Sequence, residues 1–267
     1  MKPEENYLAI NKDNWNQRVA AHLTSEFYDH ENFKKGKSSL NDIELELFED
    51  LKGKKVLHLQ CHFGQDTISL ARLGASAVGV DLSDEAIKVA KDLALELEVD
   101  AQFICSDIYD LPHHLDQKFD VVFTSYGTIG WLPDMKKWAT IIQHFLKPGG
   151  RLYFVEFHPV VWMFDYDFKE VAYNYFNQEA IIEKQEGTYA DVKAEIEASA
   201  ISWNHPISDV VNNLIQAGLE IELLNEYDYS PYNCFKHTLK ISDRKYRIIH
   251  MGNKLPMVYA IKAVKKS

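Results

Sequence analysis

Apolar and polar positions alternate in blocks along the chain, and these blocks predict strands and helices in turn. In the first unit, the apolar run at 56–59 predicts a buried strand, and helical spacing predicts a helix that is capped by Asp66 and ends before Gly74. A second strand at 77–80 ends in Asp81. This strand–loop–helix–strand unit predicts a nucleotide site, with loop N–H groups at a helix N-terminus and an acid able to hold two ribose hydroxyls.

The same alternation continues beyond this unit. Further strands are expected at 101–105, 119–124 and 152–157, and helices at 84–98 and 135–146, with a short helical turn at 111–115. Ser83 is the expected N-cap of the first of these helices, and the segment KPGG at 147–150 ends the second. Five alternations of strand and helix predict an α/β fold, a doubly wound parallel sheet with helices on both faces.

The N-terminal arm, residues 1–51, lies outside this pattern. Helices are expected at 12–23 and 43–51, with a polar loop at 28–39. Asn11 or Asp13 could cap the first helix. The arm could pack over one edge of the sheet, or it could be a lid over the ligand with Trp15 and Arg18 facing it.

The pattern also breaks after the strand at 152–157. Residues 160–202 are rich in aromatic and β-branched residues, and the Glu186-Gly187 turn predicts an inserted antiparallel hairpin. A helix at 207–217, a strand at 219–226, a long loop with the sequence YDYSPYNCF and a strand at 257–264 follow. We expect a single domain, 1–267, with a core at 52–158, the insert at 159–203 and the rest of the sheet at 204–267. The aromatic insert and loop could cover a small organic molecule or form the surface of a homodimer.

Composition narrows the function classes. The net charge of −11 argues against non-specific binding of nucleic acid, which needs a basic face. Cys61, Cys105 and Cys234 are odd in number and far apart, which suits a reducing cytoplasm better than a disulfide framework. The first residues lack the apolar core of a signal peptide, and no segment reaches the ~18 apolar residues of a membrane span. We therefore expect a cytoplasmic protein, and the charge does not exclude a small cationic ligand.

Five segments in order resemble the motifs of the class I S-adenosylmethionine-dependent methyltransferases. They are VLHLQCHFG at 56–64, GVDLS at 79–83, CSDI at 105–108, FDVVFTSYG at 119–127 and LKPGGRLYFVEF at 146–157. The resemblance implies a Rossmann-like, mostly parallel seven-stranded sheet whose last strand is antiparallel. It also implies S-adenosylmethionine as the cofactor and S-adenosylhomocysteine as the product.

The first motif departs from the usual pattern of an acid followed by alternating glycines. His58 stands at the acid position, Gln60 and His62 stand at two glycine positions, and Gly64 remains. The run HLQCHFGQDT resembles a variant first motif of a poorly characterised bacterial group of these methyltransferases. A metal site built on this histidine-rich run lacks the paired spacing of a zinc site, and we expect no metal.

The resemblance assigns roles to residues at the cofactor. Gln60, Cys61, His62 and Gly64 would line its methionine end, mainly through backbone groups. Asp81, which lies 17 residues after Gly64, would accept the ribose hydroxyls. At the other end, the resemblance implies the following contacts to the adenine: packing by Leu82, acceptance of the amino group by Asp107, and a backbone N–H from Ile108. A capping role for Asp107 is an alternative.

Residues at the ends of the next two strands are candidates for the chemistry. Ser125, Tyr126 and Trp131 would lie near the transferred methyl group. Tyr126 and His158 are the candidate catalytic residues. His158 would be a general base if the acceptor is a hydroxyl or an amine, since its ordinary pKa is near neutrality.

The sequence thus predicts a methyltransferase that transfers a methyl group from S-adenosylmethionine to a small-molecule acceptor by in-line displacement. Such a reaction mainly requires alignment and exclusion of water, so no catalytic triad is needed. One alternative is a non-catalytic module that senses the cofactor or binds a partner on the same fold. Another is an NAD(P)-dependent oxidoreductase, although the glycine fingerprint of that class is absent.

Overall fold

The computed structural model describes residues 6–176 and 179–266. The helices are α1 (Tyr7–Thr24), α2 (His30–Lys34), α3 (Asp42–Leu47), α4 (Gln65–Arg72), α5 (Asp84–Glu96), α6 (Met135–Phe145) and α7 (Ile207–Gln216). The strands are β1 (Lys55–Leu59), β2 (Ser76–Asp81), β3 (Ala101–Cys105), β4 (Phe119–Ser125), β5 (Leu146–Phe157), β6 (Ile181–Glu186), β7 (Glu197–Ser202), β8 (Leu219–Tyr227), β9 (Thr238–Ser242), β10 (Lys245–Ile248) and β11 (Val258–Lys265). Short 3₁₀ turns lie at Leu111–His113, Ile129–Trp131 and Val161–Met163.

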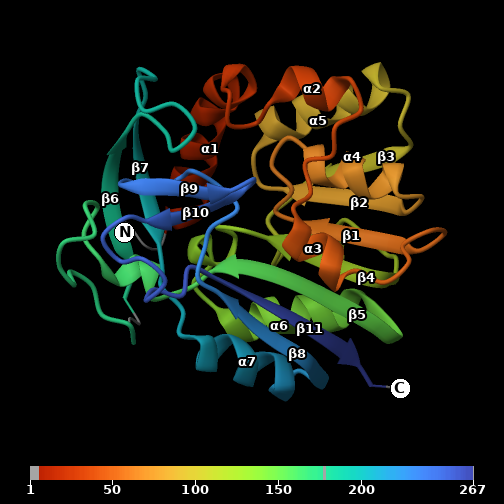
Figure 1. The fold of residues 1–267 in the computed structure, drawn as a ribbon. Coiled ribbons are helices and arrows are strands. Elements are labelled where there is room, and N and C mark those ends of the chain that lie inside the picture. The colour runs from red at the N-terminus through yellow and green to blue at the C-terminus, as the bar shows by residue number, and fades with distance from the viewer. Residues whose placement is uncertain (1–5, 177–178, 267) are drawn as a thin grey trace.

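Seven strands form one sheet in the order β3-β2-β1-β4-β5-β11-β8 (Figure 1). The pairs from β3 to β5 are parallel, and β11 is antiparallel to both β5 and β8. The predicted doubly wound sheet with an antiparallel last strand is therefore confirmed. Because parallel strands need crossover connections, the carboxyl ends of β1 to β5 all meet at one edge.

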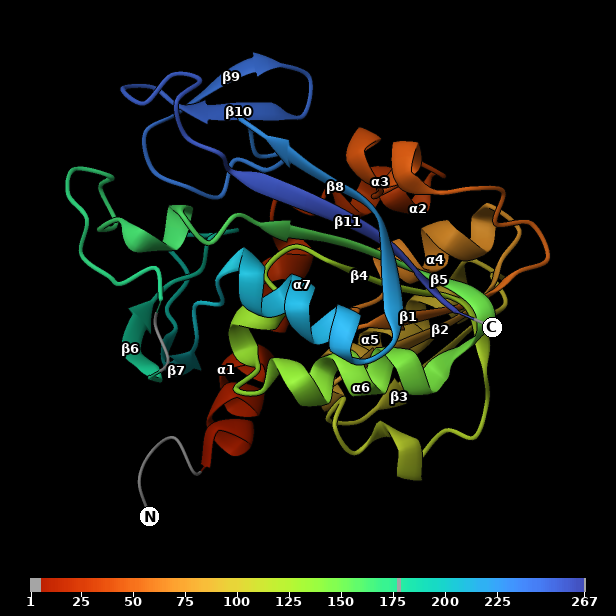
Figure 2. The same cartoon turned by 90° about the horizontal axis from the view of Figure 1, so that it is seen from below.

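Helices cover both faces of the sheet, with α6 and α7 on one side and α2 to α4 on the other (Figure 2). The core is buried on both sides. One cluster joins α6 and α7 to the sheet through residues such as Trp138 and Leu214. A second joins α3 and α4 through Ile43 and Leu70, and a third joins α4 and α5 through Ile68 and Leu93. Strands buried on both faces explain why their sequences are continuous apolar runs.

Two helix starts differ from the sequence prediction. Helix α1 begins at Tyr7, so Asn11 is not a cap, and neither is Asp13. Instead the Asn11 side chain donates to the Ile201 carbonyl at 2.8 Å and accepts from the Ile201 N–H at 2.9 Å, which ties α1 to β7. Asp66 is also not a cap, because Gly64 holds the N-cap position of α4 with φ 82°. Long-range contacts decide both points, and local sequence does not contain them.

Two other segments hold structure that the pattern did not indicate. The polar segment 28–39 contains α2, and the long loop after β8 contains the β9–β10 hairpin, in which the β9 residues are mostly exposed and the β10 residues are partly or fully buried. The predicted insert hairpin is present as β6–β7. Both hairpins and α1 gather beside the carboxyl ends of the parallel strands (Figure 1). These additions to the sheet enclose the edge where open α/β sheets bind ligands.

Candidate functional site

A cavity of about 1530 Å³ lies at the carboxyl edge of the sheet. Its walls come from α1, the loop between β1 and α4, the ends of β2 to β5, the β6–β7 insert and the loop after β8. All of the residues predicted for the site line this cavity except His158. Within residues 6–176 and 179–266, no group of three or more His, Cys, Asp or Glu side chains is arranged to hold a metal ion.

The loop after β1 adopts the glycine-rich conformation with only one glycine. Gln60, His62 and Gly64 have φ of 56°, 49° and 82°. Left-handed backbone costs a non-glycine residue roughly 1–2 kcal/mol. Two hydrogen bonds help to hold the loop: Gln60 Nε2 donates to the Thr128 carbonyl at 2.8 Å, and the His62 N–H donates to Asp81 at 2.8 Å. The loss of glycines therefore changes the side chains of the loop but keeps its backbone path.

Gly64 is required by space as well as by its φ. A Cβ atom at this position would lie 2.6 Å from a ring carbon of Phe103 and 2.9 Å from the Cβ of Ala90. No side chain fits there without displacing β3 or α5. Cys61 beside it is buried, so its thiol belongs to the packing of the loop.

Asp81 ends β2 beside this loop. One carboxylate oxygen accepts the His62 N–H, and the other accepts the Ser83 N–H at 2.9 Å. Burial raises the pKa of Asp81 to about 6, and these backbone donors oppose the shift. The carboxylate is thus held in a fixed orientation, and each oxygen can still accept a further hydrogen bond.

The far end of the cavity is apolar with one acid. Leu82, Asp107, Ile108 and Trp131 line it. Burial raises the pKa of Asp107, and the N–H groups of Tyr109 and Ile108 oppose that shift. A flat slot with a carboxylate at its rim suits a heteroaromatic ring that carries an amino group.

Helix α1 closes the cavity from above. The Trp15 ring lies 5.3 Å from the rings of both His62 and Trp131. Arg18 is only 4% exposed, lies 5.3 Å from the Trp15 ring, and donates to the side chain of Gln185 on β6. Helix α1 therefore places an aromatic and a cationic side chain at the cavity, and a lid role for the arm stays a prediction.

Arg18 is a buried cation that lacks an anionic partner. Among the residues the structure describes, no carboxylate forms an ion pair with it, and its Nε has no acceptor. Burial lowers its pKa. Three further buried atoms of residues that line the same cavity also lack a partner among the described residues: Gln60 Oε1, His62 Nδ1 and the Tyr259 hydroxyl. Since a buried unpaired charge is costly, this arrangement is typical of a site that receives an anion.

A pair of histidines joins α1 to the loop after β1. His22 Nδ1 and His62 Nε2 share a hydrogen bond of 2.9 Å. Burial lowers the pKa of His22 to about 3 and that of His62 well below its ordinary value, and the nearby Arg18 lowers both. Both rings are therefore neutral at physiological pH and add no charge to the cavity.

Glu156 organises the opposite wall, although the sequence prediction did not name it. Its Oε2 accepts from Thr128 N–H at 2.7 Å, Thr128 Oγ1 at 3.0 Å and Ile129 N–H at 3.2 Å. Its Oε1 accepts from the N–H groups of Gly127 and Phe157. The signal that could have identified Glu156 in the sequence is its position as an acid in an otherwise apolar strand. This side chain holds the β4 loop in place and is occupied by these contacts.

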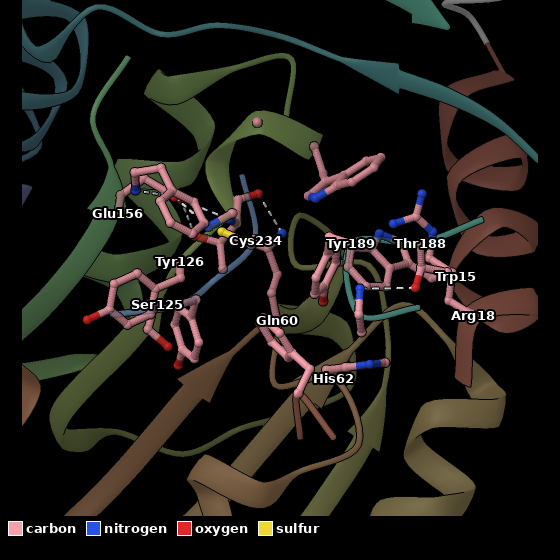
Figure 3. Close-up of a pocket in the computed structure, with 18 of the residues that line it drawn as sticks. Trp15, Arg18, Gln60, His62, Ser125, Tyr126, Glu156, Thr188, Tyr189 and Cys234 are labelled. Atoms are coloured by element: carbon pink, nitrogen blue, oxygen red, sulfur yellow. Dashed lines mark hydrogen bonds between the residues drawn. The ribbon is translucent and has the colours of Figure 1, made fainter. Parts of the chain in front are cut away.

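Ser125 and Tyr126 lie at this wall, and Gln60 lies between them and the Arg18 side (Figure 3). The Tyr126 hydroxyl donates to Glu44 at 3.0 Å, and Ser125 Oγ donates to Asp66 at 3.5 Å. Burial raises the pKa of Glu44 to about 8, so this carboxyl is mostly protonated at pH 7. The Tyr126 hydroxyl is thus committed to α3, which does not support its predicted catalytic role.

His158 does not reach the cavity. It is 4% exposed, its Nε2 shares a 2.9 Å hydrogen bond with Glu226 on β8, and its Nδ1 accepts from the Val160 N–H. The prediction of a general base at His158 does not fit this position, because both ring nitrogens are engaged away from the cavity, by Glu226 and by the Val160 N–H. His58 is also buried, but it lines the cavity, and its Nδ1 lies 2.8 Å from Thr67 Oγ1.

Comparisons with known proteins match this architecture. Residues 56–150 match a family model described as "Methyltransferase domain". A "Ubiquinone biosynthesis O-methyltransferase" of Coxiella burnetii is 34% identical over 118 residues, which are 43% of this chain and 50% of that protein. The chain spans about half the length of the curated relatives that it matches.

Solved structures extend the likeness over most of the chain. A S-adenosylmethionine-dependent methyltransferase from Mesorhizobium loti has a TM-score of 0.57 at 19% identity, covering 87% of this chain and 100% of that one. Magnesium protoporphyrin IX methyltransferase from Synechocystis, with bound S-adenosylhomocysteine, has a TM-score of 0.56 at 14% identity, covering 97% and 99%. Residues 56–150 therefore match a methyltransferase domain, and most of the chain has the fold of the S-adenosylmethionine-dependent methyltransferases.

Proposed function

We propose that the protein transfers a methyl group from S-adenosylmethionine to a small-molecule acceptor. The observation that carries this proposal is the buried Arg18 guanidinium, which has no carboxylate partner among the described residues and faces the cavity beside the left-handed loop. The methyltransferase fold and the order of polar groups along the cavity support it as well.

The residues of the cavity fit this cofactor from one end to the other. Arg18 would bind the methionine carboxylate, and the unpaired Gln60 Oε1 would accept from the ammonium group. Asp81 would hold the ribose hydroxyls. Leu82, Ile108 and Asp107 would hold the adenine ring and its amino group. The site would thus offer a counter-charge to the carboxylate, and acceptors to the ammonium, the ribose hydroxyls and the adenine amino group.

The chemistry of the cofactor is that of a methyl group on a sulfonium, which leaves a neutral thioether. The chain's own residues mainly have to position and shield it. The loop after β1 and the α1 lid exclude water, and the β4 loop held by Glu156 defines where an acceptor can approach. This division of labour explains why the site needs no metal cluster or nucleophilic triad.

Calorimetric titration with S-adenosylmethionine and S-adenosylhomocysteine tests the proposal. We expect micromolar binding by the wild-type protein and its loss in Asp81→Ala. Asp110→Ala is the matched control, since this exposed acid lies just beyond β3 and pairs only with His113 and His114. Folded protein that gives no heat with either ligand would refute the proposal. Binding without turnover over a broad acceptor panel would favour a cofactor-sensing module.

We also propose that residues 1–267 form a single methyltransferase domain that works in the cytoplasm. Three free cysteines and the absence, among the described residues, of a helix long and apolar enough to cross a membrane are compatible with this. The exposed aromatic residues Tyr166 and Phe176 of the insert make a homodimer contact a further proposal. Sedimentation equilibrium of the wild-type protein and a Tyr166→Ser variant tests it.

A further inference from the structure

The cavity is longer than the groups assigned to the cofactor. Asp81 and Asp107 mark the ends of β2 and β3, and Arg18 lies above the β1 loop, so the ends of β4 and β5 remain free beyond them. We call this remaining part the acceptor end. Four aromatic residues that contact one another in sequence line it, and we call them the aromatic wall: Phe27, Tyr28, Tyr126 and Tyr232.

The aromatic wall is continuous. Phe27 stacks on Tyr232 with ring centroids 5.3 Å apart and an interplanar angle of 24°. Tyr126 meets Tyr232 edge to face at 5.1 Å, and Phe27 meets Tyr28 at 5.1 Å. Rings in such an array present faces and edges that can surround a cation or a flat apolar group.

Two carboxyl groups lie at this wall: Glu44, which accepts from the Tyr126 hydroxyl at 3.0 Å, and Asp66, which lines the cavity. Burial raises the pKa of Asp66, and its charge in turn adds to the raised pKa values of Tyr28, Tyr126 and Tyr232. Its contact to Ser125 Oγ, at 3.5 Å, is at the limit of a hydrogen bond. The hydroxyls of Ser39 and Ser125 and the charge of Arg244 oppose the raised pKa of Asp66. Asp66 is thus a buried acid with hydroxyl partners, and among the described residues it forms no ion pair.

Most of the cationic side chains at the acceptor end are already held by hydrogen bonds or ion pairs within the protein. Arg244 donates to the carbonyls of Ser38, Ser39 and Leu40, which fixes the segment before α3. Three of the lysines that line the cavity pair with an aspartate: Lys37 with Asp29 at 2.6 Å, Lys236 with Asp167 at 3.1 Å and Lys240 with Asp243 at 3.0 Å. Lys184 of the insert is the fourth and forms no ion pair among the described residues. Apart from Lys184, an anionic acceptor would therefore meet Asp66 without a free counter-charge.

Resting on the proposed function, we infer that the acceptor is an amine carried on an apolar, aromatic-sized skeleton, bound by the aromatic wall and by Asp66. An ammonium group is complementary to both features, since rings attract cations on their faces and a buried carboxylate needs a positive partner. In this reaction Asp66 acts as the general base, the role that the sequence analysis predicted for His158.

The step balances with Asp66 as proton acceptor. One N–H proton of the ammonium passes to the Asp66 carboxylate, which leaves a neutral amine with a free electron pair. The nitrogen then bonds to the methyl carbon, and the carbon–sulfur bond breaks with its electron pair remaining on sulfur. The product is a methylated ammonium and a thioether, and Asp66 returns its proton to water. The raised pKa of Asp66 makes it a better acceptor for that proton.

A matched set of three probes tests this inference: 2-phenylethylamine, 2-phenylethanol and phenylacetate. They share one ring and differ in the charge of the terminal group. Their binding is measured by ligand-observed NMR on protein saturated with S-adenosylhomocysteine, and their methylation by release of that product. We expect the amine to bind at least about tenfold more tightly than phenylacetate, which is the effect of one charge-assisted hydrogen bond.

Asp66→Asn should remove this preference, and Asp116→Asn, a change of the same charge at an exposed loop position, should keep it. The preference of the wild-type protein remains a decisive result if Asp66→Asn does not fold. If the saturating ligand binds but the amine binds no better than the alcohol or the carboxylate, the inference is wrong while the proposed function stands. If S-adenosylhomocysteine itself does not bind, both the inference and the proposed function are refuted.

Discussion

The buried cation of the lid yields the most informative prediction, because its removal should change stability and affinity in opposite directions. We consider Arg18→Met, which keeps the length and the apolar stem of the side chain over Trp15 but removes the guanidinium. In the free protein, that group is 4% exposed, and its only described hydrogen bond goes to the uncharged side chain of Gln185.

The magnitude follows from this environment. A buried charge without an anionic partner costs more than the hydrogen bond to Gln185 returns, so the methionine variant should be more stable by about 1–3 kcal/mol in the free energy of unfolding. Binding should weaken, since truncating one partner of a buried charge pair costs about 2–4 kcal/mol, or roughly 30- to 1,000-fold in affinity.

Chemical denaturation without ligand and calorimetric titration with S-adenosylhomocysteine measure the two effects. Arg72→Met is the matched control, because this arginine also covers an aromatic ring, at 4.5 Å from Phe33, but lies outside the cavity. We expect it to lose a little stability and to keep its affinity. If Arg18→Met destabilises the free protein and binds the ligand normally, Arg18 is structural and the assignment of the methionine end is incorrect.

Three further predictions concern the rest of the site. Glu156→Gln leaves only one acceptor oxygen for donors that reach both carboxylate oxygens, so at least two N–H groups lose a partner. We expect urea denaturation to show a loss of about 3–5 kcal/mol in the free energy of unfolding. An unchanged midpoint would show that the β4 loop does not depend on Glu156. Gly64→Ala should destabilise the protein by about 2–4 kcal/mol, since the left-handed φ and the contact with Phe103 add together, and full stability with normal ligand binding would contradict the tight loop. Burial raises the pKa of Asp81 to about 6, so the carboxylate is ionised above pH 6; affinity for S-adenosylhomocysteine should rise as the pH increases from about 5 to 7 and then level off, and a flat profile would argue against a ribose contact. The pH dependence of stability has the opposite sign to that of affinity. Because the pKa of Asp81 in the folded protein lies above its ordinary value, the free energy of unfolding of the free protein should rise as the pH falls from about 6 toward 4.

The sequence by itself determined the order of strands and helices in the core. Apolar runs such as 56–59 and 119–124, together with stop signals such as Gly74 and Gly218, depend on local periodicity and on backbone freedom, which a sequence records directly. The order of the five motifs also located Asp81, Asp107 and Ser125 at one edge, since carboxyl ends of parallel strands meet there.

Only the tertiary structure decided which side chains face the ligand. His158 and Glu156 are two residues apart, yet one pairs with Glu226 on β8 and the other holds the β4 loop, because partners across the sheet are set by long-range packing. The same holds for Asp66, which local sequence marks as a helix cap but which lines the same cavity as Tyr232, far along the sequence, and helps to raise the pKa of that tyrosine. Charge and hydrogen-bond partners depend on contacts between distant segments, and the periodicity of one segment contains no information about them.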